Sequence, residues 1–388
     1  MREGSRSART LALFSVLLFA GPGIHMPFWP LWLAGHGLDE AAIGVVLATG
    51  VWTRVILVPP LVHLASGRLD HRQIISVLAL ALALTMAAHH FVTGFSASLA
   101  LGVVFGAAWA GMVPLTDSLT LLEARAGGFD YGQVRRWGSI SFLVASLLGG
   151  LLLRGRPVDA ILWTLVGLFA ALTAAARVLL RSSAPASAEE RRLGLRDLPR
   201  PWSFVLLQSS TALIQGSHGM LIGLGTLHWR GLGHHEDAIG ALWTAAIVAE
   251  VVLFSAGAAL LRGRSPLGLV ALGAAGAAIR WAGLAVFEDF WVLLFWQLLH
   301  GLSFGASHRG VMLYLDASVP RPLSALAQGL HAAISHGLGL GLGIWAAGRL
   351  YAELRGDTYA VMALFAALSL APLAALALRE RGRAAQPA

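Results

Sequence analysis

Residues 113–141 read V-P-L-T-D-S-L-T-L-L-E-A-R-A-G-G-F-D-Y-G-Q-V-R-R-W-G-S-I-S. This stretch leaves one apolar run that carries an acid, Asp117, and enters another apolar run behind two arginines, Arg135 and Arg136. Long apolar runs are typical of membrane helices, so the stretch predicts two neighbouring helices joined by a short polar turn. An acid and an arginine that face each other within such helices would form a binding site.

The composition extends the membrane prediction to the whole chain. Of the 388 residues, 57% are hydrophobic and 12% are charged, and the mean hydropathy is +0.71. Soluble domains contain about 25% charged residues, so a soluble chain of this composition could not cover its surface. Most of the protein surface is therefore expected to face lipid. Cysteine is absent from the sequence, which excludes disulfides and thiolate metal sites.

Apolar runs of roughly twenty residues, each long enough to cross about 30 Å of hydrocarbon, recur along the chain. The predicted helices cover residues 10–33, 41–65, 73–93, 96–122, 137–154, 158–181, 203–227, 237–261, 267–287, 290–315, 324–348 and 357–379. The first is expected to be broken, because it contains Gly21-Pro22-Gly23 and further prolines at 27 and 30. The predicted fold class is an all-α polytopic membrane protein, with about twelve transmembrane helices in two pseudo-symmetric six-helix bundles around a central cavity.

A polar segment near the middle of the chain divides it in two. Residues 182–202 are predicted to be a cytoplasmic linker between an N-terminal bundle (1–181) and a C-terminal bundle with a short cytoplasmic tail (203–388). A short internal repeat supports this division, since residues 38–44 read L-D-E-A-A-I-G and residues 235–240 read H-E-D-A-I-G. Related halves of this kind are typical of secondary transporters, whose site lies between the halves near the bilayer midplane.

Most arginines fall in loops on one side of the predicted membrane, which places both termini in the cytoplasm. The net charge of +8 then reflects this bias and the basic tails, and indicates no nucleic-acid partner. The sequence contains no Walker and no H-E-x-x-H motif, so ATP-driven transport and metal-dependent hydrolysis lack support, and no enzyme activity is predicted. Alternating glycines at 337, 339, 341 and 343 indicate close helix packing.

A few ionisable residues are expected deep within the helices. They are Arg54, Asp117, Arg135, Glu250, Arg280 and His300. Such side chains cost a few kcal/mol in lipid and persist when they are paired or face water. A buried ion pair that only fixes packing is the alternative for any single residue. The set favours function, because Glu250, Arg280 and His300 fall on three successive helices of one half.

The motifs around these residues resemble the major facilitator superfamily. More specifically, the chain is similar to the bacterial 3-phenylpropionate and cinnamate proton symporters and to their relative, the galactoside–proton symporter. The resemblance rests on P-F-W (27–29), Arg54, P-L-T-D (114–117), D-Y-G-Q-V-R-R-W-G-S (130–139), A-E-V (249–251), I-R-W (279–281) and L-H (299–300). The loop at 66–72 matches the superfamily's basic-acidic loop only in part.

The resemblance implies roles for individual residues. The implied substrate-binding residues are Asp117, Arg135 and Phe142, with Arg54, His25 and His218 as further candidates, and the implied proton-coupling residues are Glu250, Arg280 and His300. The galactoside symporter has an acid three positions after its histidine, where this chain has Ser303. A coupled proton would therefore be carried by Glu250 or Asp117.

The function expected from these observations is proton-coupled uptake of a small aromatic carboxylate by alternating access. The resemblance implies a monomer in the bacterial inner membrane, whose partners are the organic acid, protons and the lipid bilayer. It implies no cofactor and no metal, with the proton gradient as energy source. The open alternatives are a sugar or nucleoside symporter, a drug or metabolite exporter of the same fold, and a non-transporting membrane sensor.

Overall fold

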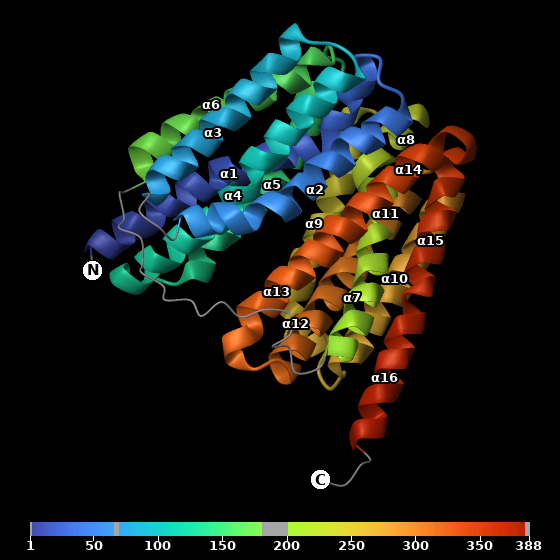
Figure 1. Ribbon diagram of the computed structural model, residues 1–388. Coiled ribbons are helices and arrows are strands. Elements are labelled where there is room, and N and C mark those ends of the chain that lie inside the picture. Colours follow the sequence, from blue (N-terminus) through green and yellow to red (C-terminus); the bar gives the residue numbers. More distant parts are fainter. Residues whose placement is uncertain (1, 66–69, 181–200, 385–388) are drawn as a thin grey trace. The chain divides into compact units, whose positions relative to one another are not determined.

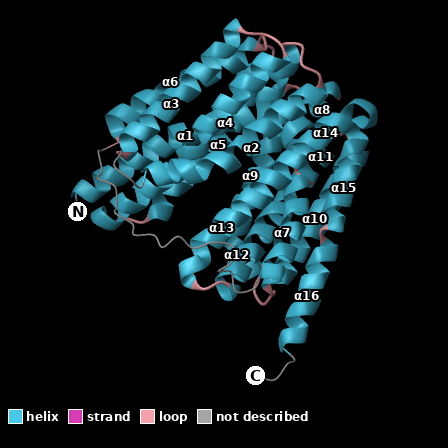
Figure 2. Cartoon of the chain, viewed as in Figure 1, coloured by secondary structure: helices cyan, strands magenta, loops and turns pink. Residues whose placement is uncertain are grey.

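The structure is a computed structural model that describes residues 2–65, 70–180 and 201–384 (Figure 1). Within these ranges the chain consists of helices joined by short loops and contains no strand (Figure 2). Residues 66–69 of the partly matching loop at 66–72, and most of the predicted linker, lie outside the described residues. The described chain forms two compact units, one of residues up to 180 with 233–244, the other of 201–232 and 245–384.

The first unit contains six long helices. They are α1 (Arg2–Gly35), α2 (Glu40–Ala65), α3 (His71–Ala88) followed by the short η1 (His89–Phe91), α4 (Phe95–Gly127), α5 (Tyr131–Leu153) and α6 (Asp159–Leu179). Within the unit, α1 packs on α5 and α6, α2 packs on α4, and α3 packs on α4 and α6. The start of α9 (Glu236–Leu260) also belongs here, where Arg154 Nη1 lies 2.7 Å from Asp237 Oδ2.

The second unit is built from shorter helical segments. They are α7 (Pro201–Gly216), η3 (Leu221–Gly225), α8 (Thr226–Gly231), the rest of α9, α10 (Pro266–Val286), α11 (Phe290–Leu298), η4 (Gly301–Ala306), α12 (Ser307–Ser318), η5 (Arg321–Leu323), α13 (Ser324–His331), η6 (Ala332–Gly339), α14 (Leu340–Leu354), η7 (Arg355–Asp357), α15 (Thr358–Leu368) and α16 (Leu370–Ala384). Of these, η3, η4 and η6 are π-helical.

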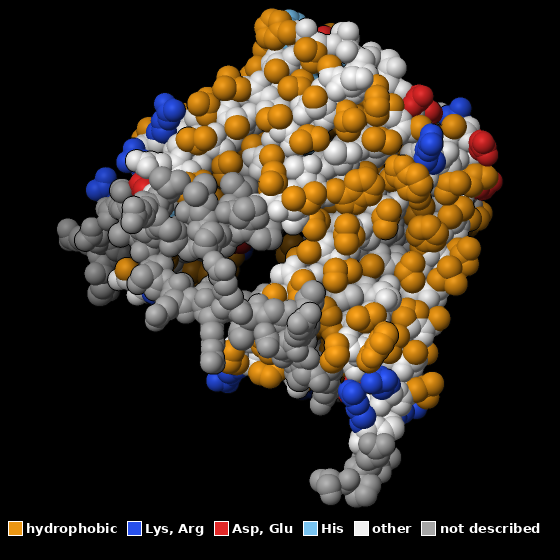
Figure 3. Space-filling model, in the orientation of Figure 1, with side chains coloured by type: hydrophobic (Ala, Val, Ile, Leu, Met, Phe, Trp, Pro, Cys, Tyr) orange, Lys and Arg blue, Asp and Glu red, His pale blue; other side chains and the backbone are white. Residues whose placement is uncertain are grey.

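The segments correspond to the predicted twelve membrane helices. In the described chain, ten helical runs are long and apolar enough to cross a membrane. One of them, Arg321–Arg383, covers two predicted spans, and the predicted span 203–227 is absent because it is divided among α7, η3 and α8. Hydrophobic side chains are spread across the described part of the face in Figure 3, as expected for a lipid-facing surface.

The turn between α4 and α5 has a simple local cause. Gly128 ends α4 with φ of 66°, a left-handed conformation that glycine adopts at little cost. Asp130 then begins α5, because its carboxylate accepts a hydrogen bond from the Gly132 N–H at 3.0 Å. The two caps turn the chain within three residues and so place the residues of α4 beside those of α5.

The prediction of a broken first helix is wrong. Helix α1 is continuous from Arg2 to Gly35 with three prolines inside it. Pro27 has no N–H to donate to the carbonyl of Gly23, four residues earlier. The Ser146 hydroxyl of α5 donates to that carbonyl instead, at 2.9 Å. Membrane helices tolerate proline where a neighbouring side chain satisfies the freed carbonyl in this way.

The alternating glycines of the last third of the chain bring α7 and α14 together, as predicted. A Cβ atom on Gly343 would overlap the backbone of Gly216 on α7. A Cβ on Gly339 would lie 2.6 Å from the Ala212 carbonyl oxygen. The two backbones are therefore in direct contact, which is the use that small residues have in membrane helix interfaces.

Candidate functional site

Helices α4 and α5 bring Asp117 and Arg135 together in the first unit. The Arg135 Nε lies 4.0 Å from Asp117 Oδ1, and each side chain is about one-third exposed. The Tyr131 hydroxyl, one turn before Arg135 on α5, interacts with both side chains. The Arg135 guanidinium carbon also lies 4.2 Å from the centre of the Phe19 ring on α1. Arg135 is thus held by an acid on one side and by an aromatic face on another.

Phe142, which is predicted to bind substrate, lies seven residues after Arg135 on α5. Its side chain is half-buried on α5, and its backbone packs on α1, where a Cβ on Gly23 would lie 2.7 Å from the Phe142 carbonyl oxygen. Phe19, which the sequence analysis did not single out, provides the ring beside Arg135. The sequence carries no signal for this contact, because it depends on how α1 is rotated against α5.

His25 and Arg54 belong to the same unit. The His25 ring on α1 is stacked between Trp29 and Phe105, with centroid distances of 5.6 and 4.5 Å. Arg54 on α2 is half-buried and interacts electrostatically with His25. Among the residues that the structure describes, Arg54 makes no ion pair with an acid.

Arg280 is the centre of a buried polar network in the second unit. Its side chain on α10 is 0% exposed and lies over the Trp281 ring. Its Nη1 donates to His300 Nδ1 at 2.9 Å and to Ser303 Oγ at 3.2 Å, and its Nη2 donates to Gln297 Oε1. An arginine only donates hydrogen bonds, so these three partners must all act as acceptors.

This donor pattern determines the tautomer of His300. Because His300 Nδ1 accepts from Arg280, the proton of a neutral imidazole is on Nε2. That nitrogen lies 3.4 Å from Glu250 Oε2 on α9. His300 therefore connects the acid to the arginine. The side chains contact one another in the order Glu250, His300, Arg280.

His218, which is predicted to bind substrate, belongs to the same polar network. Its Nδ1 lies 2.9 Å from the Ile214 carbonyl oxygen, which can only accept, so Nε2 is the acceptor nitrogen. The Ser303 hydroxyl lies 3.4 Å from that Nε2 and can donate to it while it accepts from Arg280. Ser303 therefore bridges the arginine and the histidine, and it occupies the position where the resemblance led us to look for an acid.

The structure thus divides the predicted site residues into two clusters. Asp117, Arg135, Phe142, Arg54 and His25 lie in the first unit, and His218, Glu250, Arg280 and His300 lie in the second. Phe19, Tyr131 and Gln297 also belong to these clusters but were not predicted from the sequence. Tyr131 lies inside the motif at 130–139, and Gln297 is a polar residue in an apolar run, so both carried a weak signal.

A serine motif of hydrolases also occurs in the second unit. Residues 301–305 read G-L-S-F-G, which fits the pattern G-x-S-x-G. In hydrolases this pattern forms a sharp turn between a strand and a helix that exposes the serine. Here it lies in η4, between α11 and α12, and Ser303 is fully buried. The motif therefore does not form a nucleophile elbow, and Ser303 serves the arginine network.

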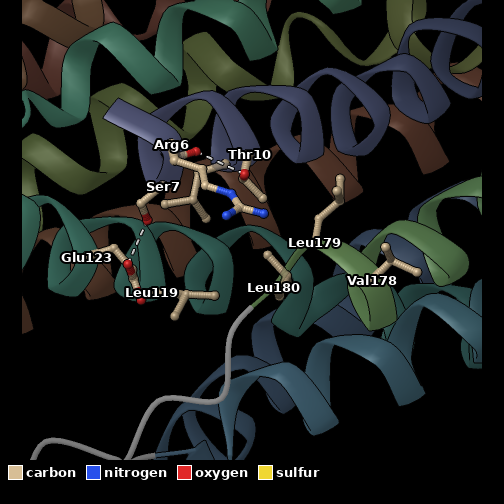
Figure 4. Close-up of a pocket in the computed structure, with 9 residues that line it drawn as sticks. Arg6, Ser7, Thr10, Leu119, Glu123, Val178, Leu179 and Leu180 are labelled. Carbon is tan, nitrogen blue, oxygen red and sulfur yellow. Dashed lines mark hydrogen bonds between the residues drawn. The ribbon is translucent and has the colours of Figure 1, made fainter. Parts of the chain in front are cut away.

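A separate cavity of about 330 Å³ lies in the first unit, between the ends of α1, α4 and α6 (Figure 4). The Ser7 hydroxyl donates to Glu123 Oε2 at 2.7 Å across its wall. Neither the Asp117–Arg135 pair nor His25 lines it. Elsewhere in the described chain, no group of three His, Asp or Glu side chains is placed to hold a metal ion.

Comparison with known proteins gives consistent matches over most of the chain. The MFS_1 like family matches residues 8–362. A probable 3-phenylpropionic acid transporter of Escherichia coli K12 is 29% identical over 93% of this chain and 96% of its own length. Maltose permease of Geobacillus stearothermophilus is 28% identical over 97% of each chain.

Solved structures match the fold. A point mutant of the nucleoside transporter NupG superposes with a TM-score of 0.85 at 16% identity and covers 96% of this chain and 99% of its own. A bacterial homologue of the human lysosomal transporter Spinster superposes with a TM-score of 0.70 at 14% identity, covering 96% of each chain. At these identities the likeness concerns the arrangement of the helices and not the substrate.

Proposed function

The chain belongs to the MFS_1 like family and is a multi-pass secondary transporter, and we propose that it takes up a small aromatic carboxylate together with protons by alternating access. Both termini then lie in the cytoplasm, in agreement with the arginine-rich loops. The protein works in this proposal as a monomer of the bacterial inner membrane, with the proton gradient as its energy source. It needs no cofactor.

The main support for the proposal is the net charge of the side chains within the membrane spans. The acids and arginines singled out within the spans comprise three positive charges, Arg54, Arg135 and Arg280, and two negative charges, Asp117 and Glu250. Arginine stays protonated in proteins, so the excess of one positive charge cannot be removed by proton loss. Uncompensated charge in a membrane is costly. A substrate anion would balance it.

Arg54 is the arginine best suited to receive that anion. Arg135 already faces Asp117, and Arg280 is fully buried among its own acceptors. Arg54 remains half-buried without an acid partner in the described chain. A guanidinium binds a carboxylate through two parallel hydrogen bonds, which is stronger and more specific than a single neutral bond.

An aromatic substrate fits the surroundings of the two half-buried cations in the first unit. Phe19 lies beside Arg135, and Phe105 stacks on His25, which interacts with Arg54. Aromatic ring pairs contribute about 0.5–1.5 kcal/mol beyond the area that they bury. The 29% identity to a probable 3-phenylpropionic acid transporter supports the same substrate class.

The proposal predicts that purified protein in lipid vesicles accumulates labelled 3-phenylpropionate when the interior is alkaline. The uncharged amide of the same acid should fail to compete, because it cannot balance the excess positive charge. Initial rates of uptake, with and without the pH gradient, measure the effect. Protein-free vesicles set the baseline, because the protonated acid also crosses lipid unaided. Gradient-driven flux of maltose or a nucleoside with none of any carboxylate would contradict the proposal and favour a sugar or nucleoside symporter.

Replacement of Arg54 by glutamine should weaken substrate binding. A hydrogen bond to a charged group contributes about 1.5–3 kcal/mol, so the concentration for half-maximal exchange should rise by about tenfold or more. Substrate exchange across vesicles under equal pH on both sides provides the measurement. Arg125→Gln, at an exposed arginine of the same unit, is the matched control and should leave the concentration unchanged. Equal behaviour of the two variants would remove Arg54 from the site.

A further inference from the structure

The second unit contains a row of rings that leads from the Glu250 network to three histidines that the proposed site does not use. It begins at His300 and continues through Phe304 to His308, with centroid distances of 5.5 and 5.7 Å and nearly parallel planes. From His308 it passes to His336 at 6.2 Å and from there to His331 at 5.4 Å. His300 lies just before η4, and the other rings come from η4, α12, α13 and η6; each is half-buried or buried.

The row leads away from the Glu250 network toward one end of the unit. That end is formed by Ser318, the last residue of α12, and Ser324, the first residue of α13, with η5 between them. At 1.5 Å per helical residue, His300 lies about 27 Å before Ser318, whereas His331 lies about 11 Å after Ser324. Arg321 is at this end, which the distribution of arginines predicts to be cytoplasmic.

The far end of the row is embedded in polar groups. His331 Nδ1 lies 3.0 Å from Gln208 Oε1, and the Ser335 hydroxyl lies 3.2 Å from the same oxygen. Thr211 and Ser335 hydroxyls are 2.7 Å apart. Each side chain of this group is buried. A buried chain of neutral donors and acceptors therefore continues from the imidazoles into α7.

A small cavity lies beside the row. Its volume is about 10 Å³, close to the size that one water molecule requires. Its polar lining consists of Thr211, Gln215, Ser307, His308 and His331. The buried Nδ1 of His308 makes no hydrogen bond to the described residues. A water in this position would have enough polar partners and would connect His308 with His331.

The near end of the row interacts electrostatically with Glu250. Glu250 interacts with His308 as well as with His300, whose Nε2 lies 3.4 Å from its carboxylate. Among the other described titratable groups, His218 interacts with His336, and His331 interacts with His308 and His336. Phe304 stacks on the His308 ring, and Phe254 makes a T-shaped contact with it. The row therefore has one acid at its start and polar groups at its end.

We propose that His308, His336 and His331 carry the coupling proton between Glu250 and the end of the second unit at η5. This inference rests on the proposed proton coupling. The protonated carboxyl of Glu250 gives its proton to one nitrogen of His308 and becomes a carboxylate. Each imidazole accepts a proton at one nitrogen and releases another from its second nitrogen, so its charge is unchanged after the step. His331 gives the last proton to water.

Packing alone would not require imidazoles at these positions. Leucine or phenylalanine fills the same volume without a polar group that must be satisfied in a membrane. Histidine is the side chain that both accepts and releases protons near neutral pH. Rings whose centroids are 5.4 to 6.2 Å apart have nitrogens within reach of one bridging water. The spacing thus suits transfer of protons along the row.

The experiment separates proton movement from substrate movement. His308→Gln, His336→Gln and His331→Gln keep a polar side chain of similar size but cannot relay a proton. In vesicles that contain a trapped pH dye, each variant should slow substrate-driven proton movement by about tenfold or more. This is the reduction in rate expected when a group that accepts and donates protons is lost. Exchange of 3-phenylpropionate at equal pH, which needs no net proton transfer, should stay within about twofold of wild type. His235→Gln, at an exposed position before α9, is the control.

The outcomes are distinguishable. Variants that move protons at the wild-type rate overturn the relay and leave the proposed function intact. Variants that lose exchange and proton movement equally, or whose thermal unfolding temperature falls in parallel, show a structural role and also overturn it. A wild-type protein that exchanges substrate without moving protons overturns both the coupling and the relay. Three separate positions keep the test valid if one variant fails to fold.

Discussion

Glu250→Gln is expected to abolish accumulation of substrate against a gradient while substrate exchange continues. The carboxylate lies at the start of the chain that passes through His300 to the buried Arg280. Glutamine has nearly the same shape and keeps a hydrogen-bonding oxygen, but it cannot take up and release a proton. Uptake with an inside-alkaline gradient and exchange at equal pH, measured on the same vesicles, give the two quantities.

Glu353→Gln is the matched control for this variant, because Glu353 is an exposed acid on α14 of the same unit. It should accumulate substrate as the wild type does. Asp117→Asn tests the other acid that could carry the proton. Uphill uptake that survives in Glu250→Gln but is lost in Asp117→Asn would transfer the coupling role to the first unit.

Arg280→Met is expected to cause the largest loss of stability. The substitution leaves Gln297 Oε1 and the acceptor nitrogen of His300 without their donor, and it leaves Glu250 without the cation at the other end of its network. Removal of one partner of a buried charged network typically costs about 3–5 kcal/mol. Thermal unfolding of the detergent-solubilised protein measures the loss. Arg264→Met, at an exposed arginine between α9 and α10, should change little.

A second substitution shows whether charge causes this effect. The double variant Arg280→Met with Glu250→Gln removes both charges, so it should be more stable than Arg280→Met alone. Arg280→Lys keeps the charge, but an ammonium group cannot reproduce the planar fork that reaches three acceptors, so its stability should be intermediate. Unfolding of Arg280→Met at the wild-type temperature would mean that the network contributes nothing to the fold.

The membrane helices could be predicted because each depends on a local property, an apolar run of sufficient length. The turn at Gly128 and Asp130 has the same character, since both caps act within a few residues. The effect of the prolines on α1, in contrast, does not depend on local sequence alone. Whether Pro27 breaks the helix depends on Ser146, which is 119 positions away and donates to the carbonyl that Pro27 leaves free. Such a contact follows from the packing of α1 on α5 and not from either segment alone.

The partners within the candidate site show the same limit. Glu250, Arg280 and His300 could be singled out because charge within an apolar run is costly and so informative. Gln297 and Ser303 are neutral, and neutral polar residues are frequent in these helices, so the sequence carried only a weak signal for them and did not identify them as partners of the arginine. Their importance becomes visible only when Arg280 is found fully buried with three acceptors around it.

The π-helical segments have a consequence for how the two halves of the chain can be aligned. A π-helical turn takes up more residues than an α-helical turn, so it is an insertion hidden inside a helix. His218 lies 193 positions after His25, whereas Gly240 lies 196 positions after Gly44, and η3 falls between His218 and Gly240. An alignment without a gap between His218 and Gly240 would shift one of these pairs out of register. Correspondence between the halves must therefore be established afresh on each side of such a segment.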